Sequence, residues 1–243
     1  MKNESYVIRK EQCPECARIG NDRSKDNLGV YSDGHSYCFK CGFTDGRRHR
    51  ISIDKPQPLS EIVLPHDTST DLPVEARMWL SQYELKRIDI EKHNILWSEH
   101  WSRIIFPYFD ETGLIAWQGR YVGTDKRKAK WFSQGKIHEI IHTIQVNHRK
   151  AILVEDIVSA IKVSKFTGAI PLFGSSLSAN HILRLKHIVD EVWIWLDPDM
   201  RGKSIKLMQL CNILNLYSHV IFSDKDPKAH TYVEVQEILN EAL

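Results

Sequence analysis

The chain has 243 residues, of which 42% are hydrophobic and 26% charged, and its formal net charge at pH 7 is +2. This length and apolar content are enough for roughly two or three small domains with cores of their own. The N-terminus is polar and no apolar run approaches about 18 residues, which excludes a signal peptide and a membrane span. The chain is therefore expected in the cytosol.

Charge is unevenly distributed along the chain. Basic residues outnumber acidic ones in residues 1–50 and 101–150, whereas acidic residues outnumber basic ones in 51–100 and 151–243. This is the arrangement expected if one part of the chain holds a polyanion and another part binds metal ions.

Four of the five cysteines lie near the N-terminus, in two Cys-x-x-Cys pairs: Cys13, Cys16, Cys38 and Cys41. Two such pairs are typical of a zinc ribbon, in which four thiolates bind one structural Zn²⁺ tetrahedrally and leave no open position. A disulfide is the alternative, but it is disfavoured in a reducing compartment. Cys211 stands alone on an apolar helical face and is expected in the core.

Charged and aromatic residues alternate in the ribbon, as they do in proteins that read single-stranded nucleic acid. They are Arg18, Arg23, Lys25, Tyr31, His35, Tyr37 and Lys40. A solvated face on a small domain explains the same residues equally well. The basic cluster at residues 47–50 either contacts phosphates or begins a linker. Residues 51–70, which are polar and contain three prolines, are predicted to be that linker.

The next segment combines helices with a β-hairpin. Apolar residues recur at helical spacing in residues 73–94, which predicts a pair of helices. Two β-rich runs around a Glu-Thr-Gly turn predict a hairpin over residues 103–121. The basic run at residues 124–130 is most simply a solvated loop. Together with Arg120, however, its Lys128 and Lys130 could bind a triphosphate, which requires several cations.

Short apolar runs and helical segments alternate in the last part of the chain. This alternation predicts βαβ units with right-handed crossovers and a mainly parallel sheet. The predicted strands are residues 151–154, 169–173, 192–196 and 220–222.

Acidic residues follow three of these strands: Glu155, then Asp197 with Asp199, then Asp226. The carboxyl ends of parallel strands lie at one edge of a sheet, where ligands bind, so these carboxylates are expected to converge. Like charges in close proximity raise each other's pKa, and a divalent cation is therefore their natural partner. The alternative for the Asp-Pro-Asp segment is that it only turns the chain and caps the next helix.

The ordered set of a glutamate, an Asp-x-Asp-x-x-Gly segment ending at Gly202 and a later aspartate resembles the Toprim domain of primases, topoisomerases and some nucleases. One position departs from the family pattern: the residue after the glutamate is usually glycine, and here it is Asp156. The hairpin and its basic loop also resemble the RNA-polymerase basic subdomain that precedes Toprim in primases.

Taken in order, nearly the whole chain resembles the primase half of phage primase–helicases, which are related to bacterial primases. The resemblance implies an α/β multidomain protein. Its parts would be a zinc-binding ribbon (1–50), a linker (51–70), an α+β basic subdomain (71–148) and a Toprim catalytic domain (149–243) with a mainly parallel sheet. The sequence has no Gly-x-x-x-x-Gly-Lys-Ser/Thr nucleotide loop, so a separate replicative helicase is expected as a partner.

The activity implied by the resemblance is that of a DNA primase, which joins ribonucleoside triphosphates into short RNA primers on single-stranded DNA. Asp197, Asp199 and Asp226 are the expected ligands of Mg²⁺ or Mn²⁺. Glu155 is either a further ligand or a base for the attacking hydroxyl. Lys225 is a further candidate for a phosphate contact. The ribbon would select the template site and steady the primer.

Two alternatives use the same modules. A Toprim nuclease needs the same carboxylates to cleave a phosphodiester. A recombination protein with zinc and Toprim modules would bind DNA without turnover, although the basic subdomain and the complete carboxylate set argue against it.

Overall fold

The computed structural model describes residues 7–20, 22, 25–32, 34–45, 62–125 and 127–242. Arg23, the basic cluster at residues 47–50 and residues 51–61 of the predicted linker lie outside the described residues. The chain divides into two compact units, Met1–Glu61 with Arg120–Phe132, and Ile62–Gly119 with Ser133–Leu243. No helix in the described ranges has the length and apolar character needed to cross a membrane.

The N-terminal ribbon is a small antiparallel sheet with strand order β1-β2-β3-β4. Its elements are β1 (Val7–Glu11), α1 (Pro14–Arg18), β2 (Leu28–Tyr31), β3 (Ser36–Cys38) and β4 (Thr44–Asp45). Its buried core consists of Leu28 and three cysteines, with Phe43 packed against them. So few apolar side chains cannot offset the entropy of ordering this segment, and a domain of this size needs a further source of stability.

A five-stranded sheet with order β5-β6-β7-β8-β9 follows. Its elements are β5 (Thr68–Ser69), α2 (Val74–Ser81), α3 (Arg87–Lys92), β6 (Leu96–Ser98), β7 (Arg103–Asp110), β8 (Gly113–Tyr121) and β9 (Trp131–Gly135). The predicted helix pair and hairpin are therefore present. The basic run at residues 124–130 lies in the connection between β8 and β9.

The end of the predicted linker belongs to this sheet. Thr68 and Ser69 pair with β6 as an antiparallel strand, and the indole N–H of Trp117 donates to the carbonyl of Val63 at 3.0 Å. Polar composition and prolines suggested a linker over residues 51–70. A short edge strand also tolerates polar residues, because one of its sides faces solvent.

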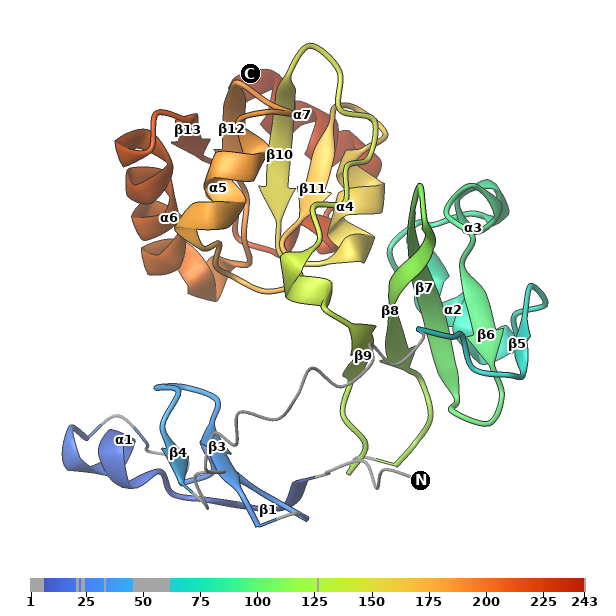
Figure 1. The fold of residues 1–243 in the computed structure, drawn as a ribbon, viewed down its shortest axis with the longest axis vertical. Coiled ribbons are helices and arrows are strands. Elements are labelled where there is room, and N and C mark those ends of the chain that lie inside the picture. The colour runs from blue at the N-terminus through green and yellow to red at the C-terminus, as the bar shows by residue number, and fades with distance from the viewer. Residues whose placement is uncertain are drawn as a thin grey trace. The chain divides into compact units, whose positions relative to one another are not determined.

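The C-terminal part is built on a parallel sheet with order β11-β10-β12-β13. Figure 1 shows helices on both faces of this sheet. Leu153 and Ile194 pack with residues of α5 and α6 in one core, which also contains Cys211, as expected. The elements are β10 (Lys150–Val154), α4 (Ile157–Val163), β11 (Ala169–Pro171), α5 (Ala179–Leu185), β12 (Glu191–Ile194), α6 (Arg201–Ile213), β13 (Tyr217–Val220) and α7 (Tyr232–Ala242).

The last strand differs from its prediction. The apolar run at residues 220–222 suggested a strand there, but β13 covers Tyr217–Val220 and pairs with Glu191–Ile194 of β12. β13 lies at the edge of the sheet and is only partly buried, so its own residues are mixed in polarity. The apolar run instead continues past the strand, where the N–H of Ile221 donates to the carbonyl of Ile194 at 3.0 Å.

A buried lysine joins the α2–α3 segment to the parallel sheet. The side chain of Lys162, on α4, is 1% exposed, and its ammonium lies 3.0 Å from a carboxylate oxygen of Glu84. Glu84 also accepts from the backbone N–H of Tyr232 at 3.0 Å, and its carbonyl accepts from the hydroxyl of Tyr232 at 3.1 Å. A buried charge is tolerated only when it is paired in this way.

Candidate functional site

The four cysteines of the ribbon form a compact cluster. Their sulfur atoms all lie within 4.8 Å of one another, with 3.6 Å between Cys13 and Cys41 and 3.7 Å between Cys16 and Cys38. Tetrahedral zinc with Zn–S bonds of about 2.3 Å requires sulfur–sulfur edges of about 3.8 Å. All four thiols are free, so the predicted zinc site fits the structure and a disulfide does not.

Backbone N–H groups point to two of the four sulfurs and favour their thiolate forms, against the effect of burial, which raises the pKa of Cys13 and Cys16. The N–H of Cys16 points to the sulfur of Cys13 at 3.5 Å, and the N–H of Cys41 points to the sulfur of Cys38 at 3.4 Å. Burial opposes ionisation of Cys38, but the N–H groups of Cys41 and Lys40 outweigh it and lower its pKa to about 7. Asp22, which the sequence did not single out, holds the first pair by accepting from the N–H of Cys13 at 2.8 Å.

The four predicted carboxylates all follow strands of the parallel sheet at its carboxyl end. Glu155 follows β10, Asp197 and Asp199 follow β12, and Asp226 lies in the segment after β13. They are close enough to act on one another: the charge of Asp199 raises the pKa of Glu155, and the charges of Glu155 and Asp226 raise that of Asp197. We call these four residues together with Asp156 the acidic edge.

A lysine lies among these carboxylates. The ammonium of Lys228, in the 3₁₀ turn Pro227–Ala229, lies 2.8 Å from Asp156, 3.0 Å from Asp226 and 3.9 Å from Asp197. Burial alone would lower the pKa of Lys228, but the charge of Asp156 and the other two carboxylates raises it overall. The sequence analysis did not predict a role for Lys228. The available signal was its position two residues after Asp226, in the segment Lys-Asp-Pro-Lys.

Two carboxylate oxygens of the acidic edge are buried without a partner. Oε2 of Glu155 and Oδ1 of Asp197 accept no hydrogen bond from any residue that the structure describes. Burial raises the pKa of Glu155, and burial raises that of Asp197 to about 7, against the pull of Lys228. Unsatisfied hard oxygen ligands of this kind fit a divalent cation. In the described ranges, only the four cysteines place three or more potential ligand atoms within 4.8 Å of one another, so the oxygens of the acidic edge are less tightly grouped than the sulfurs of the ribbon.

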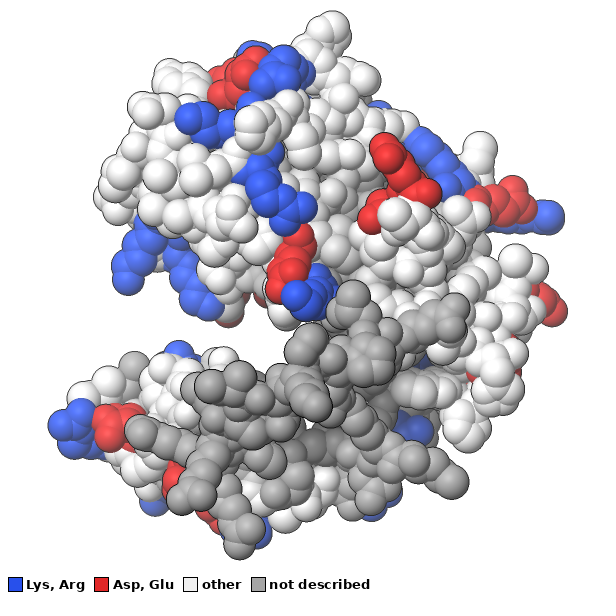
Figure 2. All heavy atoms as spheres, in the orientation of Figure 1, with Lys and Arg blue, Asp and Glu red and all other residues white. Residues whose placement is uncertain are grey.

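Three predicted phosphate-binding residues lie near the β8–β9 connection: Arg120 in the last part of β8, and Lys128 and Lys130 in the connection itself. The guanidinium of Arg120 lies 5.5 Å from the ring of Trp131, and the ammonium of Lys128 lies 5.3 Å from the ring of Tyr121. The backbone of Lys130 closes the base of the loop, since its carbonyl accepts from Tyr121 at 2.8 Å. On the face shown in Figure 2, the visible Lys and Arg side chains of the larger unit are scattered and do not merge into one patch.

Two lysines near the acidic edge have different partners: Lys225 pairs with a carboxylate and Lys203 with a hydroxyl. Lys225, predicted to contact phosphate, is exposed and forms an ion pair of 3.0 Å with Glu234, so its charge is partly balanced. The ammonium of Lys203 donates to the hydroxyl of Ser175 at 2.8 Å. Its charge also acts on Glu155, where it opposes the rise in pKa that burial causes. Lys203 directly follows the glycine of the Asp-x-Asp-x-x-Gly segment, which is the signal that identifies it.

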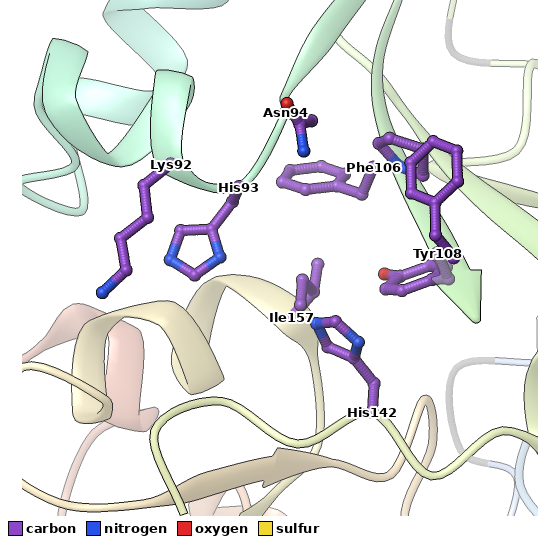
Figure 3. A pocket seen from close by; sticks show the side chains of 9 residues that line it. Lys92, His93, Asn94, Phe106, Tyr108, His142 and Ile157 are labelled. Carbon is purple, nitrogen blue, oxygen red and sulfur yellow. The ribbon is translucent and has the colours of Figure 1, made fainter. Parts of the chain in front are cut away.

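A cavity of about 170 Å³ lies between the α3 segment, β7 and the start of α4 (Figure 3). Its walls include His93, Tyr108, His142 and Ile157, the first residue of α4. The hydroxyl of Tyr108 is buried and has no hydrogen-bond partner in the described part of the chain. The cavity is smaller than the roughly 300–1,000 Å³ of ordinary ligand pockets. The unsatisfied carboxylate oxygens make the acidic edge the stronger candidate for the reaction site.

The histidines of this cavity predict a loss of stability in acid. Burial lowers the pKa of both His93 and His142 to about 4. A folded-state pKa below the unfolded value of about 6.5 means that the stabilisation is complete above pH 6.5 and is lost as the pH falls toward 4. Between pH 7 and 4.5 the free energy of unfolding should fall for both proteins. We expect it to fall by about 1–2 kcal/mol less in His142→Gln than in the wild type, after allowance for partial exposure.

Urea unfolding followed by tryptophan fluorescence at the two pH values measures this difference. The exposed His138→Gln is the matched control, and it should keep the wild-type dependence on pH. Parallel profiles for all three proteins would contradict the prediction.

No family model and no curated protein sequence matches the chain. Among solved structures, the zinc-binding and RNA polymerase domains of the Aquifex aeolicus primase superpose with a TM-score of 0.57 at 14% identity, covering 99% of this chain and 79% of that one. The chain has a DNA primase fold.

Two further primase structures support this assignment. The primase fragment of the bacteriophage T7 primase-helicase protein gives a TM-score of 0.53 at 15% identity and covers 97% of this chain and 98% of that one. The DnaG catalytic core gives 0.55 at 17% identity, with 70% and 71% covered. The predicted combination of a small cysteine-bearing sheet with a parallel-sheet domain is thereby confirmed as a primase fold.

Proposed function

We propose that the chain is a DNA primase that joins ribonucleoside triphosphates into short RNA primers on a single-stranded DNA template. The observation that supports this most strongly is the acidic edge: carboxylates from three strand ends, two of them with unsatisfied buried oxygens, on a primase fold. Nucleotidyl transfer requires such carboxylates, because charge builds up on the attacking and leaving oxygens.

The proposed catalytic metal ligands are Glu155, Asp197, Asp199 and Asp226. A divalent ion, Mg²⁺ or Mn²⁺, held by them would activate the attacking 3′-hydroxyl and neutralise the leaving pyrophosphate. Oε2 of Glu155 is also suited to accept the proton of that hydroxyl, because burial raises the pKa of this carboxyl above its usual value.

Cationic side chains would bind the triphosphate. Arg120 at the end of β8, with Lys128 and Lys130 in the following connection to β9, offers several charges in one short segment. Lys225 is retained as a further phosphate contact, although it would first have to leave Glu234. Lys203 is added because it lies close to Glu155 at the start of α6.

The ribbon would bind zinc through its four cysteines and contact the template. Tyr37 and Phe39 are exposed aromatic residues whose ring centroids lie 5.6 Å apart, and the ammonium of Lys10 lies 6.0 Å from the Phe39 ring. Exposed aromatic rings next to cations are suited to stacking with unpaired bases. The N-terminal basic and aromatic residues predicted from the sequence would extend this surface.

The proposal retains the wider roles implied by the resemblance. The parts of the chain would be the zinc ribbon (1–50), a linker from residue 51 that ends before Val63, the basic subdomain and the catalytic domain from residue 149. The RNA primer is the product, and a separate replicative helicase is the proposed protein partner. The reaction would take place in the cytoplasm, in a host bacterium if the chain is of phage origin.

A primer-synthesis assay tests the proposed function. The purified protein would be incubated with Mg²⁺, the four ribonucleoside triphosphates, one of them labelled, and single-stranded DNA of random sequence. We expect short labelled oligoribonucleotides from the wild type and none from Asp197→Ala. Cleavage of the DNA would instead support a nuclease, and binding without either product would support a non-catalytic role in recombination.

A further inference from the structure

We propose that Lys228 is a built-in cation of the acidic edge, which takes the place of a second divalent ion beside Asp226. The inference rests on the proposed function in that it concerns the metal ions which that function requires. It assigns a role to a lysine that pairs with the acidic edge and to Asp156, the member of that edge that departs from the family pattern.

The contacts of Lys228 are those of a bound cation. Its ammonium is a compact charge with three donors, and it lies within 3.0 Å of Asp156 and Asp226 and 3.9 Å from Asp197. Its side chain is only 16% exposed. In the absence of Lys228, these three carboxylates would repel one another in a partly buried site, where charges interact more strongly than in water.

The backbone of Lys228 is held in place independently of its ammonium. The buried ammonium of Lys162 donates to the carbonyl of Lys228 at 3.2 Å. The N–H of Ala229 donates to the carbonyl of Asp226 at 2.8 Å, which closes the 3₁₀ turn, and Pro227 restricts its first residue. The turn therefore presents the ammonium to the carboxylates in a preorganised position.

Asp156 fixes the other side of this contact. One of its carboxylate oxygens accepts from the N–H of Ser159 at 2.9 Å and caps α4, while the other accepts from Lys228 at 2.8 Å. Glycine, which usually occupies this position in the resembling family, has no side chain for either contact. Asp156 thus adds one negative charge and Lys228 one positive charge at the same place.

The carboxylates of the acidic edge consequently differ in their partners. The unsatisfied oxygens of Glu155 and Asp197 remain for one divalent ion, together with Asp199. Of the four proposed metal ligands, Asp226 is therefore the one that the ammonium of Lys228 occupies instead of a metal ion. A second ion at Asp226 would have to share oxygens with an ammonium or displace it, and like charges a few ångströms apart oppose this. The wild type should therefore bind one divalent ion tightly and a second one only weakly.

Mn²⁺ binding without nucleotide or template tests the inference. The free ion would be followed by electron paramagnetic resonance during titration of the full chain. Lys228→Met removes the charge and keeps the length of the side chain, and we expect it to bind a second Mn²⁺ at least about tenfold more tightly than the wild type does. Lys228→Arg keeps the charge and should retain the wild-type isotherm.

Lys206→Met is the matched control, because it removes the same charge from an exposed position on α6. An unchanged isotherm for Lys228→Met in a protein with a wild-type circular dichroism spectrum would overturn the inference, as would an equal gain for Lys206→Met. Primer synthesis by the wild type is measured separately. If primers are made while Lys228→Met gains no Mn²⁺, the inference fails and the proposed function stands.

Discussion

Replacing Asp199 by asparagine should abolish primer synthesis without unfolding the protein. The side chain is exposed, so its replacement by an amide of the same shape leaves the core intact. The amide cannot supply the negative charge that a divalent ion requires. Loss of about 4 kcal/mol of transition-state stabilisation corresponds to roughly a 10³-fold lower rate.

The measurement is the initial rate of labelled primer formation at saturating template. Asp224→Asn is the matched control: it removes an exposed carboxylate two residues before Asp226 that the proposed site does not use. The control should retain wild-type activity. Equal rates for Asp199→Asn and the wild type would remove Asp199 from the catalytic site, and equal losses in both variants would indicate a nonspecific effect of charge.

Replacing Cys16 by serine should unfold the ribbon while the larger unit remains folded. The ribbon core consists mainly of cysteines, so most of its stability has to come from the metal. Structural zinc contributes about 10–16 kcal/mol in small zinc domains at neutral pH, and the loss of one thiolate removes much of it. Bound zinc should fall well below one ion per chain.

Zinc content by atomic absorption and limited proteolysis measure this effect together. Cleavage should concentrate in the first part of the chain, and the parallel sheet should stay protected. Cys211→Ala is the matched control, because this cysteine is buried in the core beside α5 and α6 and far along the sequence from the cluster. A full zinc complement in Cys16→Ser would contradict the four-cysteine site.

Elements with strong local signals could be predicted from the sequence. The two Cys-x-x-Cys pairs indicated the cluster, because ligand spacing is a local property. The alternation of strands and helices indicated a parallel sheet, and the residues after β10 and β12 were predicted at its carboxyl end. The hairpin of β7 and β8 followed from its turn and β-rich runs.

Predictions were weaker where neighbours decide the structure. The edge strands β5 and β13 are short and mixed in polarity, so their positions depend on the strands with which they pair. The sequence alone thus suggested a linker at Thr68 and a strand at Phe222. The hydrophobic pattern of the sequence predicts a central strand, which is covered on both faces, much more clearly than it predicts an edge strand.

The order of the amino acids already places the chemistry along the chain, with four thiolates at one end and a series of carboxylates after strands at the other. How those charges are balanced depends on contacts that form only in the folded chain. Lys228 is separated from Asp156 by 72 positions, and they meet because parallel strands bring their following segments to one edge. Ion pairs between residues so far apart leave no periodic signal, since they depend on distances that exist only in the folded chain.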